Sequence, residues 1–226
     1  DVLVTPCVPN PTFSVSVGTC SECGNGIIEE GEECETTDPR CLPNCQLEGT
    51  CSDTPLAGCI TGTAAKSKLQ FKDNADNTKD SGQYALGAGA ATVIGDFGAD
   101  PSLTPGLNYK LCVYDGDGLV ADHEVPSQGT CDGKPCWKGG EKSYQYKSKS
   151  ATADGVSQIK LQPGAVGKTK VQVKMKSKLG NFVAPPLPLT EPGVRAQVVV
   201  PGGACFETAF PAATKNEASQ YSAKGP

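Results

Sequence analysis

The sequence predicts an all-β protein in which a disulfide-rich N-terminal module precedes an antiparallel β-sandwich. Three observations carry this prediction. Eight of the twelve cysteines lie in the first 60 residues, apolar and polar residues alternate in short runs after residue 60, and turn-forming residues separate those runs. No window shows the sustained 3.6-residue period that a helical domain would require.

The composition excludes several classes of protein. The 226 residues carry a net charge of −5 and include one histidine, His123. The acidic balance argues against bulk nucleic-acid binding, and one histidine cannot build a multi-histidine metal site. No run of 18 apolar residues is present, so no membrane-spanning segment is expected. No charged and apolar leader precedes Asp1, so any signal peptide is expected to have been removed.

Charge and cysteine content change together near residue 60. Residues 1–60 contain 10 acidic residues and one basic residue, Arg40, whereas residues 61–226 contain 15 acidic and 19 basic residues. The net charges are therefore −9 and +4, which indicates two modules of opposite charge. We expect an extended arm over residues 1–19, a cysteine-rich module over residues 20–60 and a β-sandwich over residues 61–226.

The arm has the pattern of an extended strand. Prolines before residue 12 disfavour a helix, and the following T-F-S-V-S-V run alternates hydroxyl and apolar side chains. A period of two places Phe13, Val15 and Val17 on one face. We expect this face to pack into the sandwich of an adjacent copy. The alternative is that the arm folds back onto its own sandwich as one more strand.

Residues 20–59 contain too little apolar surface to fold without covalent links, so we expect disulfides to define this module. The competing interpretation is zinc, because Cys20 and Cys23 have zinc-knuckle spacing and Cys41 and Cys45 could complete a site. The many carboxylates, the absence of histidine and the even cysteine count favour disulfides. They also favour an oxidising, extracellular or cell-surface location.

A short part of this module has the spacing of a known repeat. Residues 23–34 read C-G-N-G-I-I-E-E-G-E-E-C and are followed by Cys41, Cys45 and Cys51. Residues 20–51 thereby resemble the cysteine-rich repeat of myxococcal-type secreted bacterial proteins. The resemblance implies an extracellular, disulfide-bonded and often surface-exposed protein, and it implies no single activity. Where that family has an acidic D-D-G-N after the second cysteine, this chain has E-T-T-D at residues 35–38.

After residue 60 the chain reads as short strands separated by turns that are rich in Gly, Asp and Pro. The expected strands are residues 67–72, 83–86, 107–114, 119–125, 141–149, 157–161, 169–179, 195–200 and 205–210. Short strands at this spacing are typical of a β-sandwich.

One of these strands shows which residues face the core. Over residues 168–179 lysine or glutamine alternates with apolar or small residues, so Val171, Val173 and Met175 should face inward and the lysines outward. Leu69 and Phe71 should face inward in the same way. The lysines have two interpretations. They form a basic patch for an anionic polymer or for the acidic module of another copy, or they form a solvated face that prevents edge aggregation. The second is the simpler, because lysine is common on exposed strands.

All twelve cysteines are expected to form disulfides. Cys131 and Cys136 flank a short turn, so a local bridge is easy to form. Cys112 and Cys205 each lie in a strand-like run, and pairing them would link distant strands of one sandwich. The other cysteines are expected to pair among themselves: Cys7, Cys20, Cys23, Cys34, Cys41, Cys45, Cys51 and Cys59.

The sequence contains no catalytic motif, and we expect that the protein is not an enzyme. His123 lies between Asp122 and Glu124, whose side chains should point to the opposite face of a strand and so cannot orient the ring. We expect a surface histidine. The glutamate pairs at residues 29–30 and 32–33 lie in a module too small to form a sugar-binding cleft.

Calcium is the only cofactor that the sequence suggests. Asp73, Asp76 and Asp80 place oxygen ligands in one loop, and Asp115 and Asp117 place them in a Gly-rich turn. Both segments are equally consistent with ordinary Asx turns, in which such side chains accept hydrogen bonds from their own backbone.

These observations favour a secreted structural protein, a self-assembling subunit of a bacterial surface filament, sheath or adhesive layer linked through its N-terminal arm. The alternative is an extracellular module that binds carbohydrate or a cell surface, with aromatic stacking and possible help from calcium. Exposed rings would favour binding, and buried rings would favour a structural role. The rings concerned are Tyr84, Tyr109, Tyr114, Trp137, Tyr144 and Tyr146.

Overall fold

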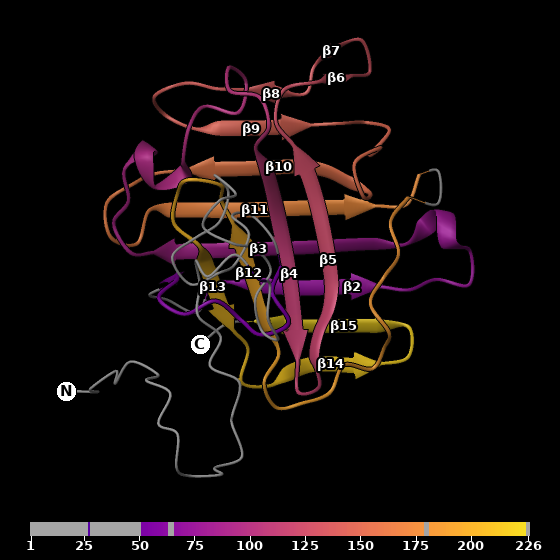
Figure 1. Ribbon diagram of the computed structural model, residues 1–226. Coiled ribbons are helices and arrows are strands. Elements are labelled where there is room, and N and C mark those ends of the chain that lie inside the picture. Colours follow the sequence, from indigo (N-terminus) through magenta and orange to yellow (C-terminus); the bar gives the residue numbers. More distant parts are fainter. Residues whose placement is uncertain (1–26, 28–50, 63–65, 179–180, 225–226) are drawn as a thin grey trace, which may run out of the picture. The chain divides into compact units, whose positions relative to one another are not determined.

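The computed structural model describes residue 27 and residues 51–62, 66–178 and 181–224 (Figure 1). Several predictions therefore lie outside the described residues. These are the arm with Phe13, Val15 and Val17, the family resemblance, and the partners of Cys7, Cys20, Cys23, Cys34, Cys41 and Cys45.

The described residues form two β-sheets and a short ribbon. The eight-stranded sheet has the order β14 (Ala213–Glu217), β15 (Gln220–Lys224), β2 (Lys68–Lys72), β3 (Ser81–Gly89), β11 (Thr169–Lys176), β10 (Val156–Gln162), β9 (Tyr144–Lys147) and β8 (Trp137–Lys138). The five-stranded sheet has the order β1 (Ile60–Thr61), β13 (Phe206–Ala209), β12 (Arg195–Val199), β4 (Asn108–Asp115) and β5 (Gly118–Pro126). The ribbon pairs β6 (Thr130–Cys131) with β7 (Lys134–Pro135).

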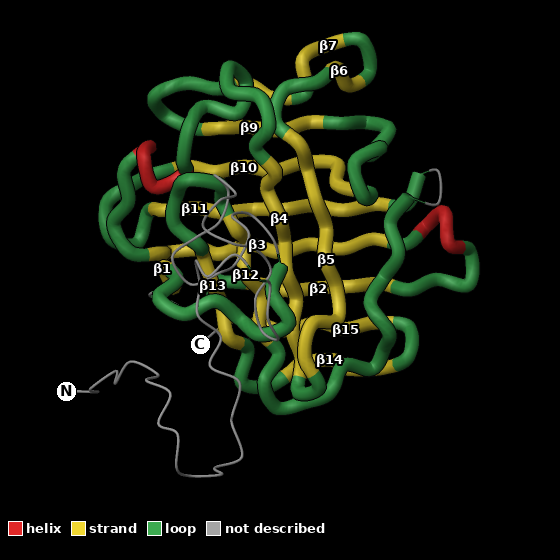
Figure 2. Tube along the Cα trace, viewed as in Figure 1, coloured by secondary structure: helices red, strands yellow, loops and turns green. Residues whose placement is uncertain are grey.

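The two sheets pack face to face, so the predicted all-β sandwich is confirmed. Strands β4 and β5 run across the strands of the larger sheet rather than along them, which is the orthogonal form of sheet packing (Figure 1). Every strand pair is antiparallel except β1 with β13. Helix among the described residues is limited to two short 3-10 turns, Asn77–Lys79 and Ile94–Phe97 (Figure 2).

The core lies between the sheets, and the alternation in the sequence places its residues correctly. Leu69, Phe71, Val171, Val173 and Met175 are all buried, as predicted. The C-terminal hairpin β14–β15, which extends the eight-stranded sheet beyond β2, was not predicted from the sequence. Only Tyr221 and Ala223 of that hairpin are buried, so its apolar pattern is too short to stand out.

Two of the predicted disulfide assignments are wrong. Cys112 pairs with Cys51 and Cys205 pairs with Cys59, so the two are not bonded to each other. Cys51 and Cys59 consequently do not pair within the cysteine-rich module. The third prediction is confirmed, since Cys131 pairs with Cys136.

The observed domain boundary also differs from the expected one, because these two disulfides join residues 51–59 to the sandwich. The compact unit that contains the sandwich is Gly49–Pro226, so it begins before the boundary expected at residues 60–61. Residues 51–59 lie on the outer face of the five-stranded sheet, where Cys51 and Leu56 pack against a small cluster of Cys112, Tyr114 and Val199. This segment is therefore part of the sandwich domain.

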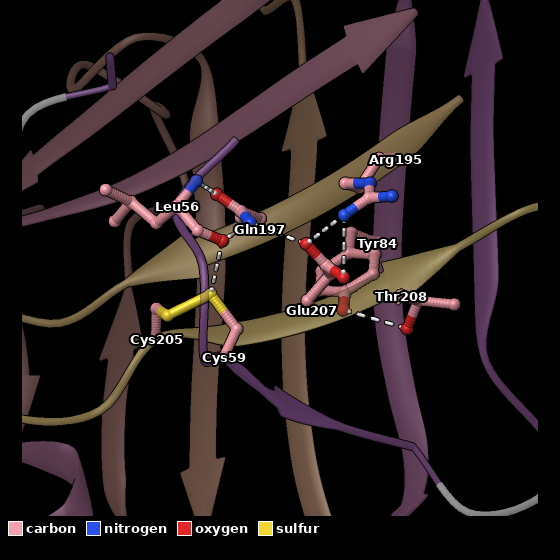
Figure 3. A network of polar contacts seen from close by, with 8 residues as sticks. All are labelled: Leu56, Cys59, Tyr84, Arg195, Gln197, Cys205, Glu207 and Thr208. Atoms are coloured by element: carbon pink, nitrogen blue, oxygen red, sulfur yellow. Dashed lines mark hydrogen bonds and ion pairs between the residues drawn. A yellow bond between two sulfur atoms is a disulfide. The ribbon is translucent and has the colours of Figure 1, made fainter. Parts of the chain in front are cut away.

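A buried polar network fastens the same segment (Figure 3). The Gln197 side chain of β12 accepts a hydrogen bond from the Leu56 N–H at 3.0 Å and donates one to the Leu56 carbonyl at 2.8 Å. Its Nε2 also donates to Glu207 of β13 at 2.6 Å, and Arg195 donates to both oxygens of Glu207 at 3.2 Å. Gln197 thus satisfies the backbone of Leu56 much as a neighbouring strand would.

Candidate binding surface

The first predicted calcium loop uses its carboxylates to hold its own backbone. Asp80 accepts a hydrogen bond from the Asn74 N–H at 2.7 Å, and Asp76 accepts from Thr78 and pairs with Lys79 at 3.0 Å. Asp73 joins no carboxylate cluster. Across the described part of the chain, no three His, Cys, Asp or Glu side chains are grouped so that they could hold a metal ion.

The second predicted calcium loop ties two segments together. Asp115 accepts a hydrogen bond from the Asp117 N–H at 2.9 Å and another from the Thr190 N–H at 2.9 Å. Asp117 accepts from the Thr190 hydroxyl at 2.7 Å. The β4–β5 turn therefore holds the loop that precedes β12, which is the Asx-turn interpretation of these residues.

His123 is buried, so the expected surface histidine is wrong. Its ring faces the core beside Phe182, with the ring centroids 5.3 Å apart. The neighbours do face the other way, as predicted, because Asp122 and Glu124 both pair with Lys110. Burial lowers the pKa of His123 below its usual value, while the charges of Asp154 and Asp122 act in the opposite direction.

The aromatic rings do not form a binding row. The tyrosines and the tryptophan that could have stacked on a sugar are all buried. Tyr109, Trp137 and Tyr146 pack against one another in the core, with centroid separations of 4.8 and 5.4 Å. These six rings therefore do not offer a stacking surface for a sugar.

One surface is built almost entirely from lysine and glutamine, and we call it the Lys–Gln face. It is the outward side of the eight-stranded sheet, opposite the core. On seven of the eight strands the outward side also includes Ser81, Ala85 and Ser222. The lysines and glutamines of these strands are Lys68, Gln70, Lys72, Gln83, Lys138, Gln145, Lys147, Gln158, Lys160, Gln162, Lys170, Gln172, Lys174, Lys176, Gln220 and Lys224.

The strand register arranges these side chains in rows across the sheet. Gln83 lies opposite Lys174, Lys174 opposite Gln158, and Gln158 opposite Lys147. A parallel row continues from Gln172 to Lys160 and then to Gln145 and Lys138. Because neighbouring strands lie about 4.8 Å apart, each row presents evenly spaced cations separated by amides.

The face carries one negative charge at its edge, because Glu217 of β14 lies opposite Gln220 and pairs with Lys215 at 3.1 Å. Strands β15, β2, β3, β11, β10, β9 and β8 are described in full, and none contains Asp or Glu. None of the lysines of the face forms an ion pair with another described residue. Opposite charges across a strand pair would contribute about 0.2–1 kcal/mol each. These strands forgo that stabilisation at every position.

The structure contradicts the edge-protection interpretation of the lysines in residues 168–179. Strand β11 lies inside the sheet, hydrogen-bonded to β3 on one side and to β10 on the other. Lysine protects a sheet from aggregation when it lies on an edge strand. Lys170, Lys174 and Lys176 therefore have no edge to protect, and a solvated face and a basic patch remain as interpretations.

Shallow clefts open on the Lys–Gln face. The cleft at its β8–β9 end has a volume of about 420 Å³, and its lining includes Lys138, Glu141 and Gln145. Two more lie beside β11. One has a volume of about 290 Å³ and lies over β2, β3 and β11, with Lys72, Gln83 and Lys174 in its lining. The other has a volume of about 430 Å³ and lies where the β6–β7 ribbon meets the ends of β9 and β11. Ser157 and Lys176 line both clefts, so the two adjoin each other.

No protein-family model and no solved structure matches the chain. None of the helices among the described residues has the length and hydropathy of a membrane span. The three disulfides are compatible with folding in an oxidising compartment.

Proposed function

We propose that this protein is an extracellular, non-enzymatic binding protein whose Lys–Gln face holds an acidic polysaccharide at a cell surface or in a matrix. The observation that carries the proposal is an extended face of unpaired lysines on seven adjoining strands, none of which contains a carboxylate. Such a face attracts a polyanion over its whole area, while the amides of glutamine can bond to hydroxyl groups between the charges.

A polysaccharide suits this face better than a nucleic acid does. Proteins that hold single strands of nucleic acid stack bases on exposed rings, and here the tyrosines and the tryptophan are buried. Reading a duplex requires an element that enters a groove, and the face is a sheet surface with side chains that alternate in rows. Its charges also come from lysine alone, without the arginine forks that match phosphate.

Binding to polygalacturonate, measured by isothermal titration calorimetry, tests the proposal, with neutral dextran as the control polymer. We expect binding to polygalacturonate that weakens steeply as salt rises, and no binding to dextran. The double variant Lys72→Gln/Lys174→Gln should bind the polymer about five- to tenfold more weakly, since each exposed contact is modest but many act together.

The matched control is Lys79→Gln/Lys110→Gln, which removes the same charge from outside the face, since Lys79 lies in a 3-10 turn and Lys110 lies on β4 of the other sheet. This variant should bind like the unmodified protein. An equal loss in both variants would show that net charge alone is responsible and would contradict the proposal. Tighter binding to single- or double-stranded DNA of matched length would show that the occupant is a nucleic acid.

A second function is favoured by the two disulfides of residues 51–59. Any tension that enters the sandwich domain from the N-terminal side meets Cys51 first and passes through Cys112 into β4. Cys59 anchors the same segment at Cys205, next to β13. This anchoring suits a subunit that is linked to its neighbours through residues 1–19 and assembles into a filament, sheath or layer.

Deletion of residues 1–19 tests the assembly role. The truncated protein should keep its β-sheet circular dichroism but should no longer form the assemblies that full-length protein shows in negative-stain microscopy. Assembly that is unchanged by the deletion, or full-length protein that stays monomeric at high concentration, would contradict this second function and leave the polysaccharide proposal untouched.

A further inference from the structure

The β6–β7 ribbon bounds one of the clefts on the Lys–Gln face. Its volume of about 430 Å³ falls in the range of small-molecule sites. One wall is the β6–β7 ribbon, which carries Lys134, and the others come from the chain after β9 and from the ends of β10 and β11. Side chains from four separate stretches of sequence therefore surround one hollow.

The ribbon wall is held in place by covalent and polar contacts. The Cys131–Cys136 disulfide closes its base, and Asp132 and Gly133 both have positive φ, at 54° and 78°, as a tight type I′ hairpin requires. Asp132 then accepts a hydrogen bond from the Lys149 N–H at 2.5 Å, which ties the tip of the ribbon to the chain after β9. The cleft is thus formed before any ligand arrives.

The lining is strongly cationic. The cleft is lined by four lysines, Lys134, Lys147, Lys149 and Lys176. Asp132 is the one acidic residue in its lining. The hydrogen bond from the Lys149 N–H occupies the Asp132 carboxylate and keeps its pKa low. None of the four lysines pairs with a carboxylate of another described residue. The cleft therefore holds a surplus of positive charge in a confined space.

Neutral donors complete the lining. The Gln158 side chain makes no hydrogen bond with other described residues, so both its amide nitrogen and its oxygen are free to contact a ligand. It lies in register opposite Lys147 and Lys174, between the cleft and the open face. A ligand with one anionic group and several hydroxyls would match this combination of ammonium and amide groups.

We propose that this cleft is a discrete subsite for a single anionic sugar unit, a uronate or a sulfated sugar, of the polymer held on the Lys–Gln face. The inference rests on the proposed function for its biological setting, but the subsite itself is a local property of the ribbon and the strand ends. The open face supplies many weak contacts, whereas the cleft supplies a fixed position for one residue of the chain.

Nuclear magnetic resonance titration of the full chain with short ligands tests the subsite. The probes are digalacturonate, galactose 6-sulfate and, as the neutral control, galactose. We expect amide shifts from residues 131–135, 147–149, 158 and 176 with an anionic probe, and none with galactose. The two anionic arms distinguish a carboxylate ligand from a sulfate ligand. Shifts spread evenly over the Lys–Gln face, or no shifts with either anionic probe, would overturn the subsite.

Two matched variants separate the cleft from the open face. Lys134→Gln/Lys149→Gln should bind the short anionic probe about tenfold more weakly, while polygalacturonate binding falls only about twofold. Lys72→Gln/Lys170→Gln, which removes equal charge from the open face, should show the opposite pattern. Equal responses of the two variants to the short probe would overturn the inference.

The two proposals fail separately. Digalacturonate could bind in the cleft while polygalacturonate binds no more tightly than digalacturonate does. In that case the proposed function is wrong and the subsite remains. If the polymer binds and the short probes do not, the subsite is wrong.

The double variant Cys131→Ser/Cys136→Ser adds a test of the fixed wall. It should stay folded by circular dichroism but bind the short probe several-fold more weakly, because the ribbon must then be ordered on binding. Unchanged affinity would contradict a preformed wall.

Discussion

Gln197 is the residue on which the attachment of residues 51–59 most depends. Its side chain is fully buried and serves the N–H and the carbonyl of Leu56 and the carboxylate of Glu207 at once (Figure 3). Truncating it leaves all three groups without that partner in a place that water does not easily reach, and an unsatisfied buried group costs about 1–3 kcal/mol.

Gln197→Ala should therefore lower the free energy of unfolding by about 2–4 kcal/mol. The control is Gln172→Ala, the same change on the partly exposed Lys–Gln face, which should cost less than about 0.5 kcal/mol. Chemical denaturation of both variants measures the difference. Equal losses would show that the network of Figure 3 does not hold the segment.

His123 predicts a dependence of stability on pH. Burial lowers its pKa in the folded state, so the unfolded chain, with a pKa near 6.5, takes up a proton first as the pH falls. Stability should then decrease as pH drops below about 6.5, before the carboxylates titrate. In the His123→Leu variant the denaturation midpoint should change less between about pH 7 and 5 than it does in the unmodified protein. An identical pH profile for both proteins would contradict a neutral buried ring.

At the scale of single residues, the sequence predicts which side chains face the core but not which polar ones are buried. The two-residue period places Val171 and Leu69 inward without any further information. The same period treats Gln197 and His123 as ordinary strand residues. Their burial depends on residues 51–59 and on Phe182, which are far away in the sequence and become neighbours only in the fold.

At the scale of strands, the Lys–Gln face lacks the cross-strand ion pairs that carboxylates would form with its lysines. Gln158 lies directly opposite Lys174 and Lys147, where a glutamate would form two cross-strand pairs. Gln158→Glu should therefore raise the free energy of unfolding by about 0.5–1 kcal/mol and at the same time weaken polygalacturonate binding.

The control for this exchange is Gln70→Glu, because Gln70 lies opposite Gln83 and Ser222 and has no lysine directly across. It should leave stability nearly unchanged. Thermal melts of the two variants measure the change in stability, and polymer titrations measure the change in binding. A Gln158→Glu protein that is no more stable, or one that binds the polymer more tightly, would remove the argument that glutamine is kept at this position for function.

The strand pattern explains which part of this face the sequence can predict. Alternating lysines in residues 168–179 identify an outward row, and they do so correctly. Whether that row lies at an edge or in the middle of a sheet depends on pairing with β3 and β10, which is not encoded in the strand itself. The edge-protection interpretation of these lysines could therefore be rejected only once the sheet order was known.

At the scale of the whole molecule, cysteine count and disulfide pairing carry different information. The count predicted an oxidised protein, and the three described disulfides agree with it. Local density suggested that the first eight cysteines form a closed set, but Cys51 and Cys59 join the sandwich instead. Proximity in sequence is a good guide only for a pair such as Cys131 and Cys136, which one tight turn brings together.

The position of the domain boundary leads to the last prediction, which compares two truncations. A chain that begins at Gly49 keeps both disulfides to Cys112 and Cys205, the Leu56 contacts and the cover over Tyr114 and Val199. A chain that begins at residue 61 loses all of them. Since each disulfide contributes about 2–4 kcal/mol, the shorter chain should melt at least about 10 °C below the longer one.

Free thiols would confuse this comparison, so the shorter chain should carry Cys112→Ala and Cys205→Ala. The longer chain should melt with a single transition, because every contact that holds residues 51–59 is retained within it. The change in composition near residue 60 favours the shorter chain as the natural unit, whereas the contacts of Leu56 and Gln197 favour the longer one. Equal melting temperatures would mean that residues 51–59 belong to the cysteine-rich module after all, and that the two disulfides join separate domains rather than complete one.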